Sequence, residues 1–366
     1  MDSAVLFVSP DRSAVVIDIP RSLEEAQVLP DQVTKRRILS SAPLQTPWDV
    51  PEPKKGAQEP GFVSPSAAIA ELMTIETVKA AIAKVKSDYH GVWCLPRITG
   101  HAVGDVSNHE YTVGSSTFAN VKEQPRKRKH DSVNSEDSVP PTTMSAPPFI
   151  PEGSHYFLGT IKSEREAFLA KAPRFDLITL DPPWPSRSVK RKRDGYSTVY
   201  GIKEAKALLS QIPIASHLAP DGLVAVWITN KATVAELLTC QGGMFEQWGL
   251  EFVAEWIWLK ITSNGDPVVD LESQWRKPWE KILIARRKHS VVRTPINTLV
   301  ILGAPDVHSR KPNLRCLFKD ILPENHVGLE IFARNLTAGW WCWGNEVLSF
   351  QQSHHWVSME NDMENK

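Results

Sequence analysis

Residues 175–184 read FDLITLDPPW, an apolar run that stops at an acid followed by two prolines. An apolar run of this length, bounded by prolines, is typical of a buried strand. Proline has no N–H group and a fixed φ, so Pro182 and Pro183 stiffen the chain directly after Asp181. The stretch therefore predicts a strand over residues 175–180 with a carboxylate held at its carboxyl end.

The sequence around this stretch alternates between strand-like and helix-like segments. We expect strands at 155–160, 175–180, 223–228, 252–259, 281–286, 298–302, 328–332 and 339–343. We expect helices at 163–171, 203–216, 231–240 and 311–320. This alternation predicts an α/β fold in which helices cover the faces of a sheet. The runs LVAVWI and KILIAR are apolar enough for central strands.

Composition divides the chain into four parts. We predict an N-terminal accessory region, partly helical, over 1–119 and a disordered linker, rich in Ser, Pro and charge, over 120–150. The main folded unit follows at 151–352, because 11 of the 13 tryptophans lie from Trp184 onward. Residues 353–366 are expected to be a disordered tail.

One helix is predicted in the accessory region, from about residue 64 to 87. Ser64 suits the N-cap position, and Pro65 fits the first turn. Apolar residues then recur with helical spacing at Ile69, Leu72, Met73, Ile75 and Val78. We expect this stripe to pack within a small accessory domain.

The overall composition limits the classes of function. Net charge is zero, so any binding to a polyanion must come from local basic patches. The four cysteines lie far apart, without zinc-site spacing, which fits a reducing compartment and no metal site. The N-terminus does not resemble a signal peptide, and no segment approaches the ~20 apolar residues that span a bilayer. We therefore expect a soluble intracellular protein without a membrane partner.

A basic cluster lies inside the predicted linker, at Arg126-Lys127-Arg128-Lys129. Such clusters are of the type that nuclear-import receptors bind, and a disordered segment is accessible to a receptor. We expect a nuclear protein with a cytoplasmic pool. The alternative is a solvated charge run.

Asp181 stands where open α/β sheets bind their ligands, beyond the carboxyl end of a strand. Its carboxylate, the Pro182 carbonyl and the flat face of Trp184 together suit a planar ring that bears an amine. The exocyclic amine of adenine fits, because its two hydrogens can go to Asp181 and Pro182, which aims the nitrogen lone pair at an electrophile. The alternative is a strand-to-loop turn with a capping aspartate.

Three motifs carry a resemblance to a known family. DPPW at 181–184 resembles the catalytic motif of the N6-adenine methyltransferases related to the subunit that methylates messenger-RNA adenosine, the MT-A70-like family. HSRKP at 308–312 and EIFARNLTAGWWCWGNE at 330–346 are similar to its other motifs and follow in the same order. The wider sequence looks closest to the methyltransferase-like protein four branch. The resemblance covers roughly residues 155–352.

The resemblance implies a Rossmann-like methyltransferase sheet, circularly permuted so that the amine motif precedes the cofactor motif. It implies S-adenosyl-L-methionine as the cofactor and an in-line displacement that needs no metal. The catalytic residues would be Asp181, Pro182, Pro183 and Trp184. The cofactor-binding residues would be Asp181, Lys311, Arg334, Asn335 and Asn345, with backbone near Gly159 against the cofactor's adenine. A guanidinium or ammonium group suits a carboxylate, and amides suit ribose hydroxyls.

The segment after the catalytic motif is strongly basic, because residues 187–193 read RSVKRKR. A loop there can clamp the phosphates that flank a target nucleotide. We expect the nucleic-acid-binding residues to be Lys190, Arg191, Lys192, Arg193 and, by stacking on a base, Tyr196. The alternative is a solvated loop. A second basic and aromatic stretch, residues 274–281, is a candidate for another wall of the same site.

Three functions remain open at this point. The first is N6-adenine methylation of RNA, either small nuclear RNA or adenosine that already bears a 2′-O-methyl group. The second is the same chemistry on DNA, which the basic loop does not distinguish because it contacts phosphate. The third is a catalytically silent RNA-binding partner, against which the intact motifs argue. The sequence identifies no protein partner beyond an import receptor.

Overall fold

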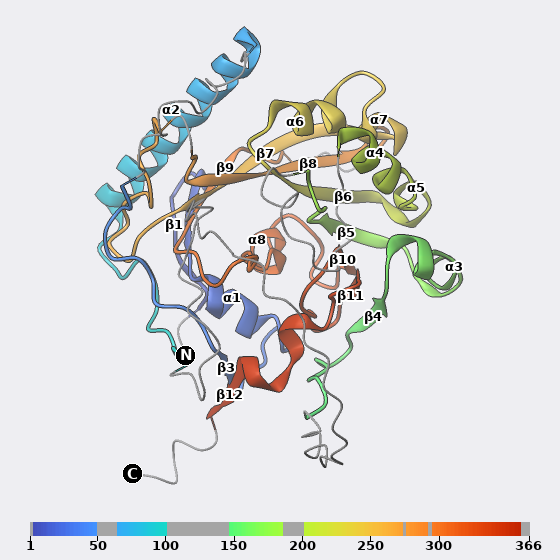
Figure 1. Ribbon diagram of the computed structural model, residues 1–366, viewed down its shortest axis with the longest axis horizontal. Helices are drawn as coiled ribbons and strands as arrows, with labels where there is room; N and C mark the ends of the chain where they lie inside the picture. The colour runs from blue at the N-terminus through green and yellow to red at the C-terminus, as the bar shows by residue number, and fades with distance from the viewer. Residues whose placement is uncertain are drawn as a thin grey trace, which may run out of the picture.

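The computed structural model describes residues 3–49, 64–100, 146–185, 201–273, 276–291 and 295–359. The main strands are β1 (Val5–Val8), β2 (Ala14–Ile17), β4 (His155–Leu158), β5 (Phe175–Leu180), β6 (Leu218–Ile228), β7 (Leu250–Lys260), β8 (Trp279–Arg287), β9 (Leu299–Gly303), β10 (Gly328–Ile331) and β11 (Trp341–Gly344). They form one ten-stranded sheet in the order β1-β2-β9-β7-β8-β6-β5-β10-β11-β4 (Figure 1). Pairing is mostly parallel, and β8 runs antiparallel to β6 and β7.

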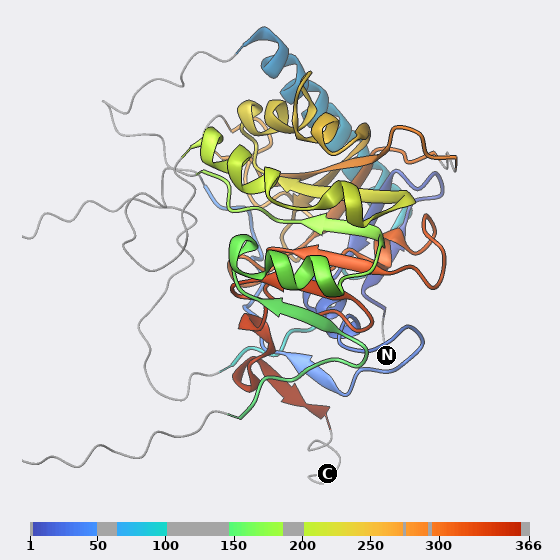
Figure 2. The same ribbon diagram turned by 90° about the vertical axis from the view of Figure 1, so that its right-hand side faces the viewer.

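The described helices are α1 (Ile19–Glu25), α2 (Pro65–Asp88), α3 (Ile161–Lys171), α4 (Ile202–Ser210), α5 (Ile214–His217), α6 (Ala232–Thr239), α7 (Met244–Gln247) and α8 (Arg315–Phe318). Helices α3 to α7 cover one face of the sheet, and α1 and α8 cover the other (Figures 1 and 2). The α/β fold predicted from the alternation of elements is therefore confirmed. None of the described helices has the length and apolar composition needed to cross a bilayer.

Strand β6 shows why helices pack on both faces of the sheet. Val224, Val226 and Ile228 point to the core under α3 to α7, whereas Leu223, Ala225 and Trp227 point to the core under α1 and α8. Successive side chains of a strand alternate between faces, so a continuous apolar run is stable only between two layers of helices. The prediction of central strands at LVAVWI and KILIAR is confirmed.

Two of the predicted helices differ from the structure. The helix expected at 203–216 is divided into α4 and α5, with Pro213 as the N-cap of α5. Proline breaks a helix because it lacks the N–H donor that the interior needs. The helix expected at 311–320 is reduced to the short α8, because residues 311–314 line a pocket instead.

The N-terminal segment is not a separate accessory unit. Strand β2 pairs in parallel with β9, so β1 and β2 extend the main sheet. All four residues of β2 are buried, which explains why AVVI is apolar throughout. Our expectation of an N-terminal region outside the main sheet was wrong for these strands, since their partners lie almost 300 residues away in the chain.

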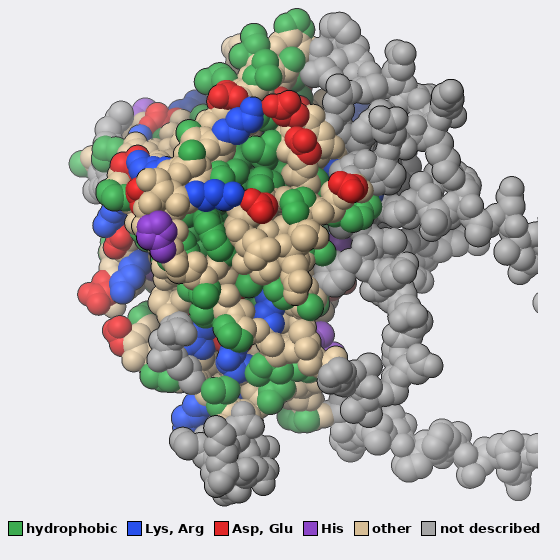
Figure 3. Space-filling model, turned by 90° about the vertical axis from the view of Figure 1, so that its left-hand side faces the viewer, with side chains coloured by type: hydrophobic (Ala, Val, Ile, Leu, Met, Phe, Trp, Pro, Cys, Tyr) green, Lys and Arg blue, Asp and Glu red, His purple; other side chains and the backbone are tan. Residues whose placement is uncertain are grey.

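Helix α2 begins as predicted, with the Ser64 hydroxyl accepting a hydrogen bond from the N–H of Ala67 at 3.3 Å. Its later turns pack on β2 and β9, and Ile75 and Val78 are buried there. The start of the helix projects past the sheet (Figures 1 and 3), and hydrophobic side chains gather at that end. The other residues of the predicted stripe are therefore exposed: Ile69, Leu72 and Met73.

The C-terminal prediction was wrong for residues 353–359. They form a 3-10 turn and strand β12 (Trp356–Ser358), which pairs antiparallel with β3 (Arg36–Ile38). Trp356 is buried there, against Leu23 and Ile38, and that burial holds the strand in place. The end of the predicted linker is also ordered, because the N–H of Phe149 donates to the carbonyl of Gln351 at 3.0 Å. The rest of the linker prediction and residues 360–366 lie outside the described residues.

Candidate active site

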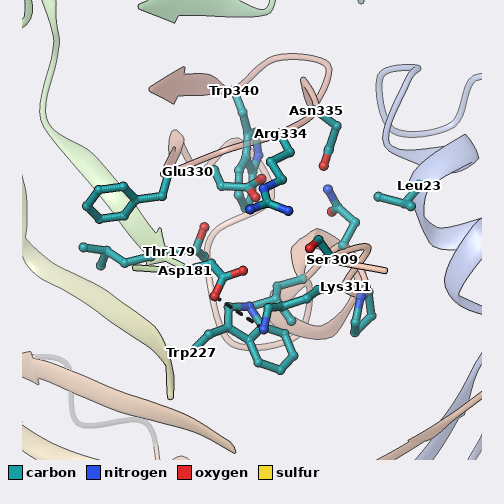
Figure 4. Close-up of a pocket in the computed structure, with 15 residues that line it drawn as sticks. Leu23, Thr179, Asp181, Trp227, Ser309, Lys311, Glu330, Arg334, Asn335 and Trp340 are labelled. Carbon is teal, nitrogen blue, oxygen red and sulfur yellow. Dashed lines mark ion pairs between the residues drawn. The ribbon is translucent and has the colours of Figure 1, made fainter. Parts of the chain in front are cut away.

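A pocket opens at the carboxyl ends of β5 and β10 (Figure 4) and contains about 550 Å³ of empty space, open solvent included. Parallel pairing of Leu180 with Ile331 places the two strand ends side by side, and the N–H of Asp181 donates to the carbonyl of Ile331 at 3.3 Å. The lining residues are Leu23, Thr179, Leu180, Asp181, Trp227, Ser309, Lys311, Pro312, Asn313, Leu314, Glu330, Phe332, Arg334, Asn335 and Trp340. Five separate segments of the chain therefore meet at this edge of the sheet.

Two of the pocket walls turn through left-handed backbone at residues other than glycine. Ser309 has φ 73° and Phe332 has φ 63°. Such conformations cost energy for residues with a Cβ and are found where surrounding contacts hold them. Each lies two residues before a pocket cation, Lys311 and Arg334 respectively, so the turns direct these side chains inward.

The structure brings together four of the residues predicted to bind the cofactor. Asp181, Lys311, Arg334 and Asn335 all line the pocket, although the chain separates them widely. Asn345 is not among the lining residues and is exposed after the end of β11.

The rest of the catalytic motif supports the pocket from outside it. Pro182 is buried, and Pro183 and Trp184 are partly buried beside the sheet. The indole N–H of Trp184 donates to the carbonyl of Trp227 at 2.7 Å, which ties the turn to the end of β6. The predicted nucleic-acid residues Lys190, Arg191, Lys192, Arg193 and Tyr196 lie outside the described residues.

Lys311 links two acids at the base of the pocket. Its Nζ lies 3.4 Å from Asp181 Oδ1 and 2.5 Å from Glu280 Oε2, and it stands 4.8 Å above the ring centre of Trp227. The other oxygen of Glu280 accepts a hydrogen bond from Lys260 Nζ at 2.7 Å. A chain of alternating charges thus runs from Asp181 through Lys311 and Glu280 to Lys260.

These charges shift one another's pKa values. Burial alone raises the pKa of Glu280, but Lys311 and Lys260 outweigh it and bring the value to about 2. Burial lowers the pKa of Lys311, and the two neighbouring acids reverse this and raise it. Burial raises the pKa of Asp181, and Lys311 and Arg334 offset only part of that rise. Lys311 therefore stays charged, and Glu280 stays ionised beside it.

Sequence reasoning missed several residues of the site. Glu280 belongs to the stretch that we expected to form a basic wall, yet its cations pair elsewhere: Lys277 with Glu71, and Lys281 with Glu255 at 2.9 Å. Glu330 and Trp227 were missed as well, and both line the pocket. An acid inside the short apolar strand GLEI was an available signal, because a charged residue in a central strand needs a reason.

The fold and the pocket define an open α/β protein that binds its ligand beyond the carboxyl ends of parallel strands. Residues 175–346 match the family model described as MT-A70. A protein of Cryphonectria parasitica named N6-methyladenosine RNA methyltransferase MTA1 is 46% identical over 362 residues, which span 97% of this chain and 94% of that protein. The chain therefore belongs to the MT-A70 family.

Two animal proteins match a smaller share of the chain. The human N(6)-adenine-specific methyltransferase METTL4 is 34% identical over 231 residues, 60% of this chain and 47% of that protein. The Caenorhabditis elegans DNA N6-methyl methyltransferase is 37% identical over 209 residues, 56% of this chain and 54% of that protein. The match to the fungal protein covers 97% of this chain, so it takes in the N-terminal part that contributes to the sheet.

Proposed function

We propose that this protein transfers a methyl group from S-adenosylmethionine to the N6 amine of adenine in RNA. Membership of the MT-A70 family supports N6-adenine methylation of nucleic acid as the activity. The observation that carries the proposal is the position of Asp181, at the end of a central strand, facing a pocket and 3.4 Å from the half-buried Lys311.

The pocket residues fit the proposed cofactor. Lys311 and Arg334 suit a carboxylate, and the amide of Asn335 suits ribose hydroxyls. Trp227 and Trp340 offer apolar walls. When bound, S-adenosylmethionine supplies a methyl group on a positively charged sulfur. Asn345, which lies outside the pocket lining, stays a candidate only through the family motif.

The protein's own contribution is positioning. The Asp181 carboxylate and the Pro182 carbonyl accept the two hydrogens of the target amine, which directs its lone pair at the methyl group. Asp181 also favours the positive charge that develops on the amine during transfer. The Trp184–Trp227 hydrogen bond keeps the turn rigid, so the two acceptors hold their spacing. Stacking of the base near Trp184 remains part of the proposal.

The order of the motifs supports a circularly permuted, Rossmann-like arrangement, because Asp181 precedes the cofactor residues Lys311 and Arg334. A target inside a duplex would have to be flipped out, so single-stranded or opened nucleic acid is the easier substrate. RNA is favoured because two relatives that match almost the full chain are named RNA methyltransferases. Small nuclear RNA and 2′-O-methylated adenosine are the narrower RNA candidates.

DNA is the second candidate, on the strength of the similarity to the Caenorhabditis elegans protein. A silent RNA-binding partner is the third, and the assembled pocket argues against it, because binding RNA alone needs no Lys311–Asp181 pair inside a pocket. We also propose nuclear import through residues 126–129, a segment outside the described residues.

The test is transfer of labelled methyl from S-adenosylmethionine to matched RNA and DNA oligonucleotides, with the product nucleosides identified by mass. We expect label on N6 of adenosine in RNA. Asp181→Ala should lower the rate by at least about 10²–10³-fold, the effect of removing one oriented electrostatic group, while donor binding persists. Asp266→Ala, which removes an exposed carboxylate paired with Lys86, is the matched control and should retain activity.

The other outcomes separate the candidates. Label in DNA alone would support the second candidate and contradict RNA as the substrate. Donor binding without transfer to either polymer would support the silent partner. An undiminished rate in Asp181→Ala would remove the central residue of the mechanism.

A further inference from the structure

Strand β4 is the last strand of the ten-stranded sheet, so within the described residues one of its edges has no neighbouring strand (Figure 1). On its other edge it pairs with β11, where the N–H of His155 donates to the carbonyl of Trp340 at 2.9 Å. The backbone groups of successive residues point to alternate sides of a strand, so those of Tyr156 and Leu158 point towards the free edge. Such groups are a template for a further strand.

The side chains at this edge are apolar as well. Tyr156 is 40% exposed and Leu158 is 53% exposed, and both lie on the same face of the strand because they are two residues apart. Exposed edge strands commonly carry a lysine, a proline or a bulge that prevents pairing with another chain. The β4 sequence HYFL has none of these, and its register with β11 is continuous. The composition of β4 therefore indicates an edge that another strand covers.

A groove runs along β4, and we call it the edge groove. One wall consists of β4 and Trp341, and the other is the face of α3 that carries Glu164, Ala167 and Lys171. These three residues follow the spacing i, i+3 and i+7, which places them on one face of a helix. Among the described residues neither Glu164 nor Lys171 takes part in an ion pair. The edge groove therefore has an acidic end, a basic end and a small residue between them.

The strand and the helix share one centre. Phe157 lies between the two exposed side chains of β4, and its ring centre is 5.5 Å from that of Phe168 on α3. Phe168 in turn lies close to the midpoint between Glu164 and Lys171 along the helix. A two-fold axis beside Phe157, perpendicular to the sheet, would therefore bring the acidic end of one groove to the basic end of a second. A patch that complements itself in this way suits a symmetric pair of identical chains.

We propose that two copies of this chain form a symmetric dimer in which their β4 edges pair antiparallel and continue the sheet from one copy into the other. Tyr156 of each copy lies opposite Leu158 of the second copy, so the outward backbone groups bond to each other and the apolar side chains leave water. Glu164 of each copy faces Lys171 of the second copy. Because the strands of the two copies run in opposite directions, the candidate active sites open at opposite ends of the joint sheet.

The first test is sedimentation velocity of the full-length protein in the range from about 1 to about 100 µM. We expect the average mass to rise from one chain to two across this range. Tyr156→Pro removes an outward N–H and an exposed ring but leaves the hydrogen bonds to β11, so it should stay monomeric. A wild-type protein that is monomeric throughout, or a Tyr156→Pro variant that dimerises as well as wild type, would overturn the proposal.

Charge reversal tests the two-fold geometry itself. Glu164→Lys and Lys171→Glu each place like charges at both contacts of a dimer, so each should weaken dimerisation about tenfold or more at low salt. An equimolar mixture of the two variants should dimerise as wild type does, because every contact then joins opposite charges again. Glu166→Lys makes the same change of net charge at an exposed position of α3 outside the edge groove, and it is the matched control.

The mixture separates this dimer from other arrangements. Restored dimerisation in the mixture supports the proposed axis, because the two variants fail alone for complementary reasons. If the mixture stays as weak as the single variants, or if both single variants dimerise like Glu166→Lys, the two α3 helices do not face each other and the proposal is overturned. Thermal unfolding checks that each variant is folded. The charge variants lie on a helix surface, so they decide the matter even if Tyr156→Pro does not fold.

Discussion

Glu280 is the residue whose replacement tests the electrostatics of the site most directly. It joins Lys311, at 2.5 Å, to Lys260, at 2.7 Å, and its side chain is only 26% exposed. Glu280→Gln keeps the size of the side chain, so no cavity forms, and removes the charge that both lysines share. We expect a large loss of stability because two ammonium groups lose a common partner in a poorly hydrated place.

The magnitude follows from the pKa of Glu280. Its ordinary value of 4.5 falls to about 2 in the folded protein. At 1.36 kcal/mol per pK unit, ionised Glu280 contributes about 3 kcal/mol of stability at neutral pH. Because the folded-state pKa is the lower one, this contribution is complete above about pH 4.5 and is lost as the pH falls towards 2.

Urea unfolding followed by tryptophan fluorescence measures the effect. At pH 7 Glu280→Gln should lower the free energy of unfolding by about 3 kcal/mol, and its stability should fall less than that of wild type between pH 4.5 and pH 3. Glu251→Gln removes an acid that is 37% exposed and paired with Arg286, so it should cost less than about 1 kcal/mol. If Glu280→Gln matched this control, the charge chain would not stabilise the fold and our reading of the site would be refuted.

Two further predictions concern segments outside the described residues. Neutralising the four cations of 190–193 together should weaken RNA binding and reduce the slope of log affinity against log salt by up to about 3, at about 0.7 per contact with a single strand. Filter binding from roughly 50 to 300 mM salt measures this, and an unchanged slope would mean that the loop contacts no phosphate. Deleting 125–130 should move a fluorescently tagged protein from the nucleus to the cytoplasm, as microscopy would show. Continued nuclear concentration would exclude this cluster as the import signal.

The sequence predicted the elements of the sheet well wherever local composition decides them. Strand β5 has the predicted bounds, 175–180, and every other strand expected after residue 151 is present with ends shifted by a few residues. Apolar runs bounded by turn residues are a local signal, because both faces of a central strand must be buried. The N-cap at Ser64 is a local signal as well, and it is present in the structure.

The candidate site was only partly accessible from the sequence. Motifs pointed to Asp181, Lys311, Arg334 and Asn335, which the structure gathers in one pocket. Glu280 has no motif around it, and its role depends on Lys260 in β7 and on Lys311 in the segment between β9 and α8. Which charges meet is a property of distance in space, and residue spacing along the chain does not encode it.

The sequence by itself determined the α/β class, the strand that ends in Asp181 and the family motifs, because each depends on residues close together in the chain. Only the tertiary structure decided that β1 and β2 complete the sheet and that β12 pairs with β3. It alone also decided that, within the described residues, Glu330 has no ion-pair partner although the other charged residues of the pocket lining have one. The physical reason is that strand pairing, burial and pKa shifts arise from groups that the fold brings together, and these groups lie tens to hundreds of residues apart in the chain.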